Sequence, residues 1–157
     1  MKIEWVGSKL PFGYKCLAKK ALKATLVELE QSKRISICIN IISPEEMQDL
    51  NKRTRGIDKV TDVLSFPSAT ISAFEKVQDV EDYENHGGGL FFIGDMAICM
   101  EEVLRQVDDY NESKARVFAR LVIHSVLHLL GFDHIEDSDH AVMEPIQNKI
   151  LNTVIKK

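Results

Sequence analysis

Hydrophobic positions along the chain repeat with two different periods, which predicts that helices and strands alternate. Between residues 14 and 31, leucine, alanine and valine recur at helical spacing among lysines, as in an amphipathic helix. Residues 34–42 instead alternate isoleucine with polar side chains, which is typical of a half-buried strand. The sequence Ser43-Pro44-Glu45-Glu46 then combines an N-cap residue, a first-turn proline and two acidic side chains, so a second helix is expected to run to about Arg53.

The second half of the chain predicts further strands, followed by more helices. The predicted strands are 61–66 and 89–93, with 96–100 as a candidate extension, and the predicted helices begin at 101, span 113–130 and span 138–155. The helix over 113–130 is apolar on nearly every side after Leu121, so we expect it to be buried at the centre of the fold. Residues 68–89 contain a run of glycines and several acidic side chains, which predicts a mobile surface loop.

Length and composition are those of one globular domain. At 157 residues the chain is long enough to bury a core without disulfides, so residues 1–157 are expected to form a single α/β domain. Hydrophobic residues make up 45% and charged residues 28%, and no apolar run reaches the length of a membrane span, so neither disorder nor a membrane protein is indicated. The start Met-Lys-Ile-Glu-Trp has an acidic residue where a secretory signal would become apolar, which favours a cytoplasmic protein. The cysteines Cys16, Cys38 and Cys99 are far apart, and we expect them to be reduced core residues.

The net charge of the chain and one local basic cluster bear on whether it binds nucleic acid. A net charge of −4 argues against broad, non-specific binding to nucleic acid, which normally depends on an excess of lysine and arginine. A local basic cluster is nevertheless present at Lys52, Arg53 and Arg55. Such a cluster is either a nucleic-acid contact or an ordinary solvated helix face.

Three histidines close together carry the most specific chemistry of the chain. His124 and His128 are four residues apart on the predicted central helix, about 40° apart in projection, so both imidazoles point the same way. Gly131 is suited to end this helix in a left-handed turn that brings His134 back toward the pair. Three imidazoles without a shared partner would leave several buried nitrogens unsatisfied, whereas one metal ion binds a nitrogen of each ring. We therefore expect His124, His128 and His134 to bind one metal ion.

The ligand set favours a catalytic zinc ion. Three imidazoles suit Zn²⁺ and leave a fourth position open for water, although other divalent metals also bind imidazole; no other cofactor is indicated. The centre would keep its positive charge and attract an anionic substrate such as a phosphodiester. In a His-Glu-x-x-His metallopeptidase the general base follows the first histidine, but this chain has Ser125 there. Peptide hydrolysis with a base from elsewhere stays open as an alternative.

Longer motifs around the histidines resemble those of one family. Residues 124–134 are similar to His-Gly-x-x-His-Leu-x-Gly-Tyr-Asp-His, the signature of the YbeY family of bacterial metal-dependent endoribonucleases. Residues 61–67 read Thr-Asp-Val-Leu-Ser-Phe-Pro, as in that family, with Leu50-Asn51 and Arg55 at the expected distances upstream. Gly94-Asp95 resembles the family's Gly-Asp-Ile. The resemblance covers roughly residues 45 to 145.

The resemblance implies a fold, an activity and one more site residue. The implied fold is a zincin-like α/β (α+β) domain, in which a small mixed sheet packs with helices and the histidine helix is central. The implied activity is cleavage of single-stranded RNA, in 16S ribosomal RNA 3′ end maturation and ribosome quality control, with ribosomal RNA and the small ribosomal subunit as partners. Arg55 becomes a catalytic residue, since a guanidinium binds phosphate in bidentate fashion and stabilises charge developing on it.

Two other functions stay open, and the chain departs from the family pattern at three places. The alternatives are a metallopeptidase or other small zinc hydrolase, and a non-catalytic ribosome assembly factor with a structural metal. Ser125 replaces a glycine, Phe132 replaces a tyrosine, and the acidic segment 68–89 is longer than its counterpart. Asp62 and Asp133 are candidates to accept the second imidazole N–H of a metal-bound histidine. The acidic segment would repel RNA if it lay over the site.

Overall fold

A four-stranded mixed sheet forms the centre of the fold. The computed structural model of the chain describes residues 1–80, 89–107, 112–133 and 137–155. The strands β1 (Lys2–Gly7), β2 (Ile35–Ile41), β3 (Val63–Pro67) and β4 (Phe91–Ile98) lie in the order β1-β2-β4-β3. β1, β2 and β4 are parallel, and β3 pairs antiparallel with β4 at one edge. The predicted α/β fold with a small mixed sheet is therefore confirmed.

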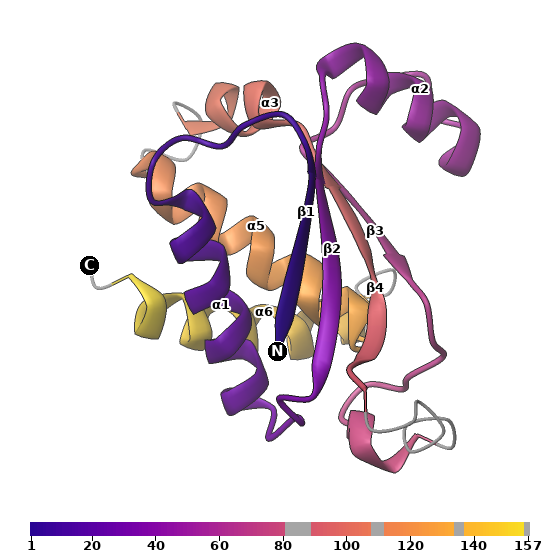
Figure 1. Cartoon of the computed structure of the whole chain (residues 1–157), viewed down its shortest axis with the longest axis vertical. Coiled ribbons are helices and arrows are strands. Elements are labelled where there is room, and N and C mark those ends of the chain that lie inside the picture. The colour runs from indigo at the N-terminus through magenta and orange to yellow at the C-terminus, as the bar shows by residue number, and fades with distance from the viewer. Residues whose placement is uncertain (81–88, 108–111, 134–136, 156–157) are drawn as a thin grey trace.

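Helices cover the two faces of the sheet unequally. Figure 1 shows α1 (Tyr14–Glu28), α5 (Lys114–Leu129) and α6 (Asp137–Val154) gathered on one side, and α2 (Pro44–Arg55) on the other. The short helices α3 (Met100–Arg105) and η1 (Val77–Asp79) complete the described elements. Strand residues such as Ile37 and Ile39 are fully buried against the three-helix side. A smaller cluster beneath α2, around Met47 and Leu64, packs on the opposite face.

The central helix α5 follows its prediction closely. Ser113 caps its first turn by accepting a hydrogen bond from the Arg116 N–H, 3.2 Å away. Its apolar side chains are buried on several sides, with Phe118, Ile123 and Leu127 fully inaccessible to solvent. No helix within the described ranges is long and apolar enough to cross a membrane. Because its apolar side chains are buried on several sides, α5 is a core helix, and it holds the side chains of its polar stripe at fixed positions.

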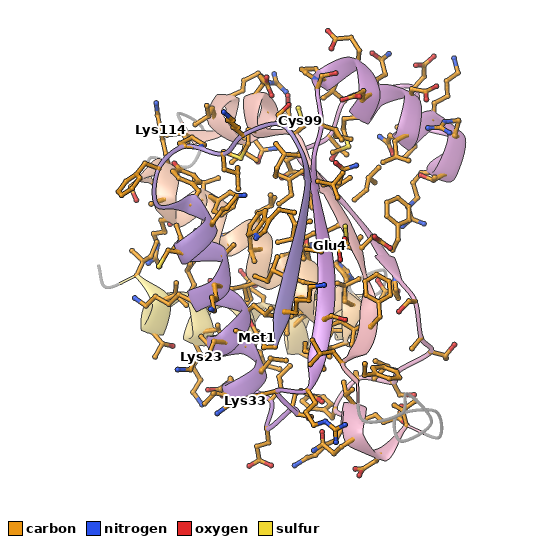
Figure 2. All side chains as sticks on the ribbon, in the orientation of Figure 1. Met1, Glu4, Lys23, Lys33, Cys99 and Lys114 are labelled. Carbon is orange, nitrogen blue, oxygen red and sulfur yellow. The ribbon has the colours of Figure 1, made fainter. Side chains whose placement is uncertain are left out.

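Two sequence interpretations need correction. Residues 2–7 form β1, which the hydrophobic pattern did not predict, because Lys2 and Glu4 alternate with only two half-buried side chains, Ile3 and Trp5. The cysteines are not uniformly core residues, since Cys16 is exposed and Cys38 is half-buried. Cys99 is buried where β4 meets α3, as Figure 2 shows, and burial raises the pKa of its thiol. Much of the predicted loop 68–89 is described, but residues 81–88 lie outside the described ranges.

Candidate functional site

His124 and His128 face each other on the last two turns of α5. Their ring centroids are 4.6 Å apart and the ring planes are nearly perpendicular, at 82°. The two Nε2 atoms are 3.1 Å apart. The structure therefore directs one nitrogen of each imidazole to the same point in space, as the spacing predicts.

The other ring nitrogen of each histidine is bound to an oxygen. His128 Nδ1 lies 2.8 Å from the backbone carbonyl of Phe132, and His124 Nδ1 lies 2.9 Å from Oε1 of Gln147 on α6. A carbonyl oxygen only accepts hydrogen bonds, so Nδ1 is the donating nitrogen in both rings. In the neutral imidazoles, Nε2 then presents its lone pair.

Two lone pairs at this separation repel each other unless a cation lies between them. In a tetrahedral zinc site with Zn–N bonds of about 2.0–2.1 Å, neighbouring nitrogens are roughly 3.3 Å apart. The observed 3.1 Å between the Nε2 atoms is close to that value. The donor set of His124 and His128 thus fits a metal ion that prefers imidazole nitrogen.

The end of α5 explains how Phe132 reaches His128. Gly131 has a φ of 84°, its N–H bonds to the His128 carbonyl, and the Phe132 N–H bonds to the Leu127 carbonyl. This pair of bonds is the Schellman arrangement that closes a helix with a left-handed residue. A side chain at Gly131 would begin 1.8 Å from the Ile71 carbonyl oxygen, so the position accepts only glycine. The same turn ends the helix and aims the Phe132 carbonyl at the imidazole.

At the Nδ1 atoms of these two rings the structure places Gln147 and Phe132, and Asp62 is bonded elsewhere. Asp62 Oδ1 instead accepts hydrogen bonds from the Thr61 hydroxyl at 3.1 Å and from the Val63 N–H at 2.8 Å. Gln147 and the Phe132 carbonyl thus take, at His124 and His128, the role considered for Asp62, while the role of Asp133 stays a prediction. The sequence held one signal for Gln147, because it lies four residues after Met143 and three before Ile150 on the otherwise apolar, buried stripe of α6.

A cavity of about 910 Å³ extends from the histidine pair to Arg55 of the basic cluster. His124, His128, Gln147 and Arg55 all line it, together with residues of β3. Arg55 is the last residue of α2, and its Nη2 donates to the Ser65 carbonyl at 3.1 Å. Its guanidinium lies 5.6 Å from the centre of the Phe66 ring, within the range of a cation–π contact. The fold thus brings Arg55 from the opposite side of the sheet to the same cavity as the imidazoles.

The third expected ligand, His134, lies outside the described residues. Within the described ranges, no group of three or more histidine, cysteine, aspartate or glutamate side chains is placed to hold a metal. The described part of the site therefore consists of two imidazoles, their two oxygen partners and Arg55.

Comparisons with known proteins match this arrangement to one family. The family model described as Endoribonuclease YbeY matches residues 5–155. The chain belongs to the YbeY family. Endoribonuclease YbeY of Caldanaerobacter subterraneus subsp. tengcongensis is 37% identical over 139 residues, covering 88% of this chain and 86% of the relative. Endoribonuclease YbeY of Lachnospira eligens is 39% identical over 121 residues, 72% of each chain.

A solved structure supports the fold over nearly the whole chain. The solution structure of TM1509 from Thermotoga maritima superposes with a TM-score of 0.63 at 26% identity, covering 97% of this chain and 88% of that one. The family match, from residue 5 to residue 155, thus extends well beyond the motifs at 61–67 and 124–134. It begins within β1, which the hydrophobic pattern did not predict.

Proposed function

We propose that this chain is a metal-dependent endoribonuclease that cleaves single-stranded ribosomal RNA in the cytoplasm. The observation that carries the proposal is the pair of Nε2 atoms, 3.1 Å apart, in a cavity that Arg55 also lines. Family membership supports the RNA substrate, since the relatives are named endoribonucleases. We extend this to 16S ribosomal RNA 3′ end maturation and ribosome quality control, in contact with the small subunit, with residues 1–157 acting as one domain.

His124, His128 and His134 would hold a single divalent ion, which we propose is Zn²⁺. When bound, such an ion polarises a phosphate oxygen and lowers the pKa of coordinated water toward neutrality. Gln147 and the Phe132 carbonyl keep Nδ1 protonated, so Nε2 stays available as the ligand atom in both described rings. The protein's contribution is therefore a fixed tautomer and a fixed ring orientation.

Arg55 would bind the scissile phosphate. Its guanidinium is oriented by the Ser65 carbonyl and the Phe66 ring, which leaves further N–H groups of the fork for phosphate oxygens. A preorganised cation at this position stabilises charge that develops during cleavage. Arg55 therefore acts on the reacting group, while the imidazoles act through the ion.

Ser125 weighs against the metallopeptidase alternative. The residue that would be a peptidase's general base is fully buried on α5, and the described cavity lining does not include it. A serine hydroxyl is also a poor base at neutral pH. The peptidase alternative would need a base from another part of the cavity.

The test is a cleavage assay on a defined single-stranded RNA, with metal content measured on every variant. We expect His128→Ala to lose both metal and activity, and Arg55→Ala to keep the metal but lose about 10²–10³-fold in kcat/KM. Arg53→Ala is the matched control, because Arg53 forms an exposed ion pair with Asp49 on the same helix and does not line the cavity. A 2′,3′-cyclic phosphate on the product would identify the RNA 2′-hydroxyl, rather than water, as nucleophile.

Two results would overturn the proposal. Metal-dependent cleavage of peptides with inert RNA would favour a metallopeptidase. If His124→Ala unfolds the protein while Arg55→Ala leaves RNA processing unchanged, the metal is structural and the protein is an assembly factor.

A further inference from the structure

Arg120 lies on the same face of α5 as the two histidines. It precedes His124 by four residues, as His124 precedes His128, so the three side chains follow one another along the helix at about one turn each. Arg120 lines the same 910 Å³ cavity as Arg55 and the imidazoles, and its side chain is 25% exposed. The cavity is therefore lined by two arginines, Arg55 at the end of α2 and Arg120 in the first half of α5.

The cavity and its continuation extend farther than one bound phosphate requires. A second cavity of about 450 Å³ adjoins the first, sharing His128, Gly131 and Pro67 and continuing along residues 68–71. From Arg120 to His128 is eight residues, or about 12 Å along the helix axis. Pockets for single small ligands usually have volumes of about 300–1,000 Å³. The two cavities together exceed that range, so they have room for neighbouring nucleotides on both sides of the histidines.

Arg120 belongs to an ion-pair network at the start of α5. Glu112 is shared by two arginines, with one oxygen on Arg120 and the other 3.2 Å from Arg116 Nε. Arg116 is also fixed to α6, since it donates to the Ile155 carbonyl at 3.0 Å and to Asn152 Oδ1 at 2.8 Å. Of the two guanidinium groups that contact Glu112, Arg120 lines the cavity and Arg116 does not. A phosphate beside Arg120 would meet a side chain already oriented by its ion pair.

We propose that Arg120 binds the phosphate next to the scissile one, so that the cavity recognises at least two consecutive phosphates of a single RNA strand. The inference rests on the proposed function and names how that site selects an oligonucleotide. A guanidinium fork suits this task, because it binds phosphate oxygens in bidentate fashion. Successive phosphates of one stacked strand are about 3.4 Å apart along the axis and farther apart when the strand is extended, which is compatible with a step of one helical turn.

The test compares three variants of the ion-pair network. Arg120→Gln should weaken binding of a single-stranded RNA about tenfold, raise KM more than it lowers kcat, and reduce the slope of log affinity against log salt by about 0.7. Glu112→Gln should act in the opposite direction and tighten binding, because it removes a carboxylate that competes with phosphate for Arg120. Arg116→Gln is the matched control, since it removes the same charge from the same network but from a side chain outside the cavity.

A chemical variant of the substrate tests the contact without any mutation. RNAs carrying a neutral methylphosphonate on the 5′ or the 3′ side of the cleavage position should bind the wild type less tightly at one of the two positions. The same substitution should have no further effect on Arg120→Gln. If Arg120 is only structural, Arg120→Gln and Glu112→Gln will both lower the melting temperature and neither will change RNA affinity or the salt slope. Wild-type protein that neither binds nor cleaves RNA would contradict the proposed function itself, whereas a cleaving enzyme indifferent to Arg120→Gln contradicts only this inference.

Discussion

Ser125→Ala is expected to stabilise the protein, although it replaces the residue beside His124, a proposed metal ligand. Ser125 is completely buried on α5, and among the described residues its Oγ is the buried side-chain polar atom without a hydrogen-bond partner. An unsatisfied buried hydroxyl costs about 1–3 kcal/mol, and alanine adds up to about 0.5 kcal/mol of helix propensity. The cavity that the missing oxygen leaves, roughly 15 Å³, destabilises the variant by only about 0.4 kcal/mol.

The expected gain for Ser125→Ala is therefore about 1–3 kcal/mol of unfolding free energy. At this chain length each kcal/mol raises the melting temperature by about 2–4 °C. Urea and thermal unfolding should be measured with a chelator present, because a metal that binds only the folded state would add its own stabilisation. Metal content, measured separately, should not change.

Ser125→Gly is the matched control for this prediction. It removes the same oxygen but is a poorer helix former, so it should be about 1 kcal/mol less stable than Ser125→Ala. The reasoning is refuted if Ser125→Ala unfolds more easily than the wild type. That result would mean that the hydroxyl is satisfied within the folded protein.

Three further predictions concern Gln147, the glycine that ends α5, and the cysteines. Gln147→Leu should lower metal affinity about 10–100-fold in a chelator competition, whereas Gln147→Glu should retain it. If Gln147→Leu binds metal as tightly as the wild type, Gln147 does not position His124. Gly131→Ala should lose much more unfolding free energy than Gly56→Ala, because both have positive φ but only Gly131 has a backbone oxygen within 4 Å of the added carbon. Denaturant titration of the two variants compares the losses directly, and similar values would contradict the close approach. Cys16 is exposed and should be alkylated by iodoacetamide well before Cys99, whose pKa is raised by burial; mass spectrometry after brief labelling shows the order.

Local signals were sufficient to predict most elements. The predicted helix 113–130 is observed as Lys114–Leu129, because the Ser113 cap and the Gly131 turn are set by neighbouring residues. The candidate extension over 96–100 is confirmed as far as Ile98, since β4 runs from Phe91 to Ile98. β1 was missed because its stability comes from pairing with β2, more than thirty residues later in the chain. A short strand with charged alternate residues carries little of that information in its own sequence.

The site was predictable only where its geometry is local. The spacing of His124 and His128 fixes their common direction, because both lie on one helix. Gln147 reaches His124 through the packing of α6 against α5, and its place on the apolar stripe of α6 marks it as buried without identifying His124 as its partner. The Phe132 carbonyl was missed for a different reason, because the identity of a residue does not show where its backbone carbonyl points. Arg55 came from the family resemblance, and the structure shows why spacing could not supply it: α2 and α5 lie on opposite sides of the sheet.

The open edge of β3 bears on the choice between RNA and peptide. Asp62 and Ser68 bond toward β4, so the alternate residues Val63, Ser65 and Pro67 direct their backbone groups outward, along the cavity. A peptide substrate bound as an added strand would need those groups. The Val63 N–H is already bonded to the Asp62 carboxylate, the Ser65 carbonyl accepts from Arg55, and Pro67 has no N–H to donate. The β3 edge that lines the histidine cavity is therefore poorly suited to pair with an extended peptide, and Arg55, which occupies the Ser65 carbonyl, is the residue proposed to bind phosphate.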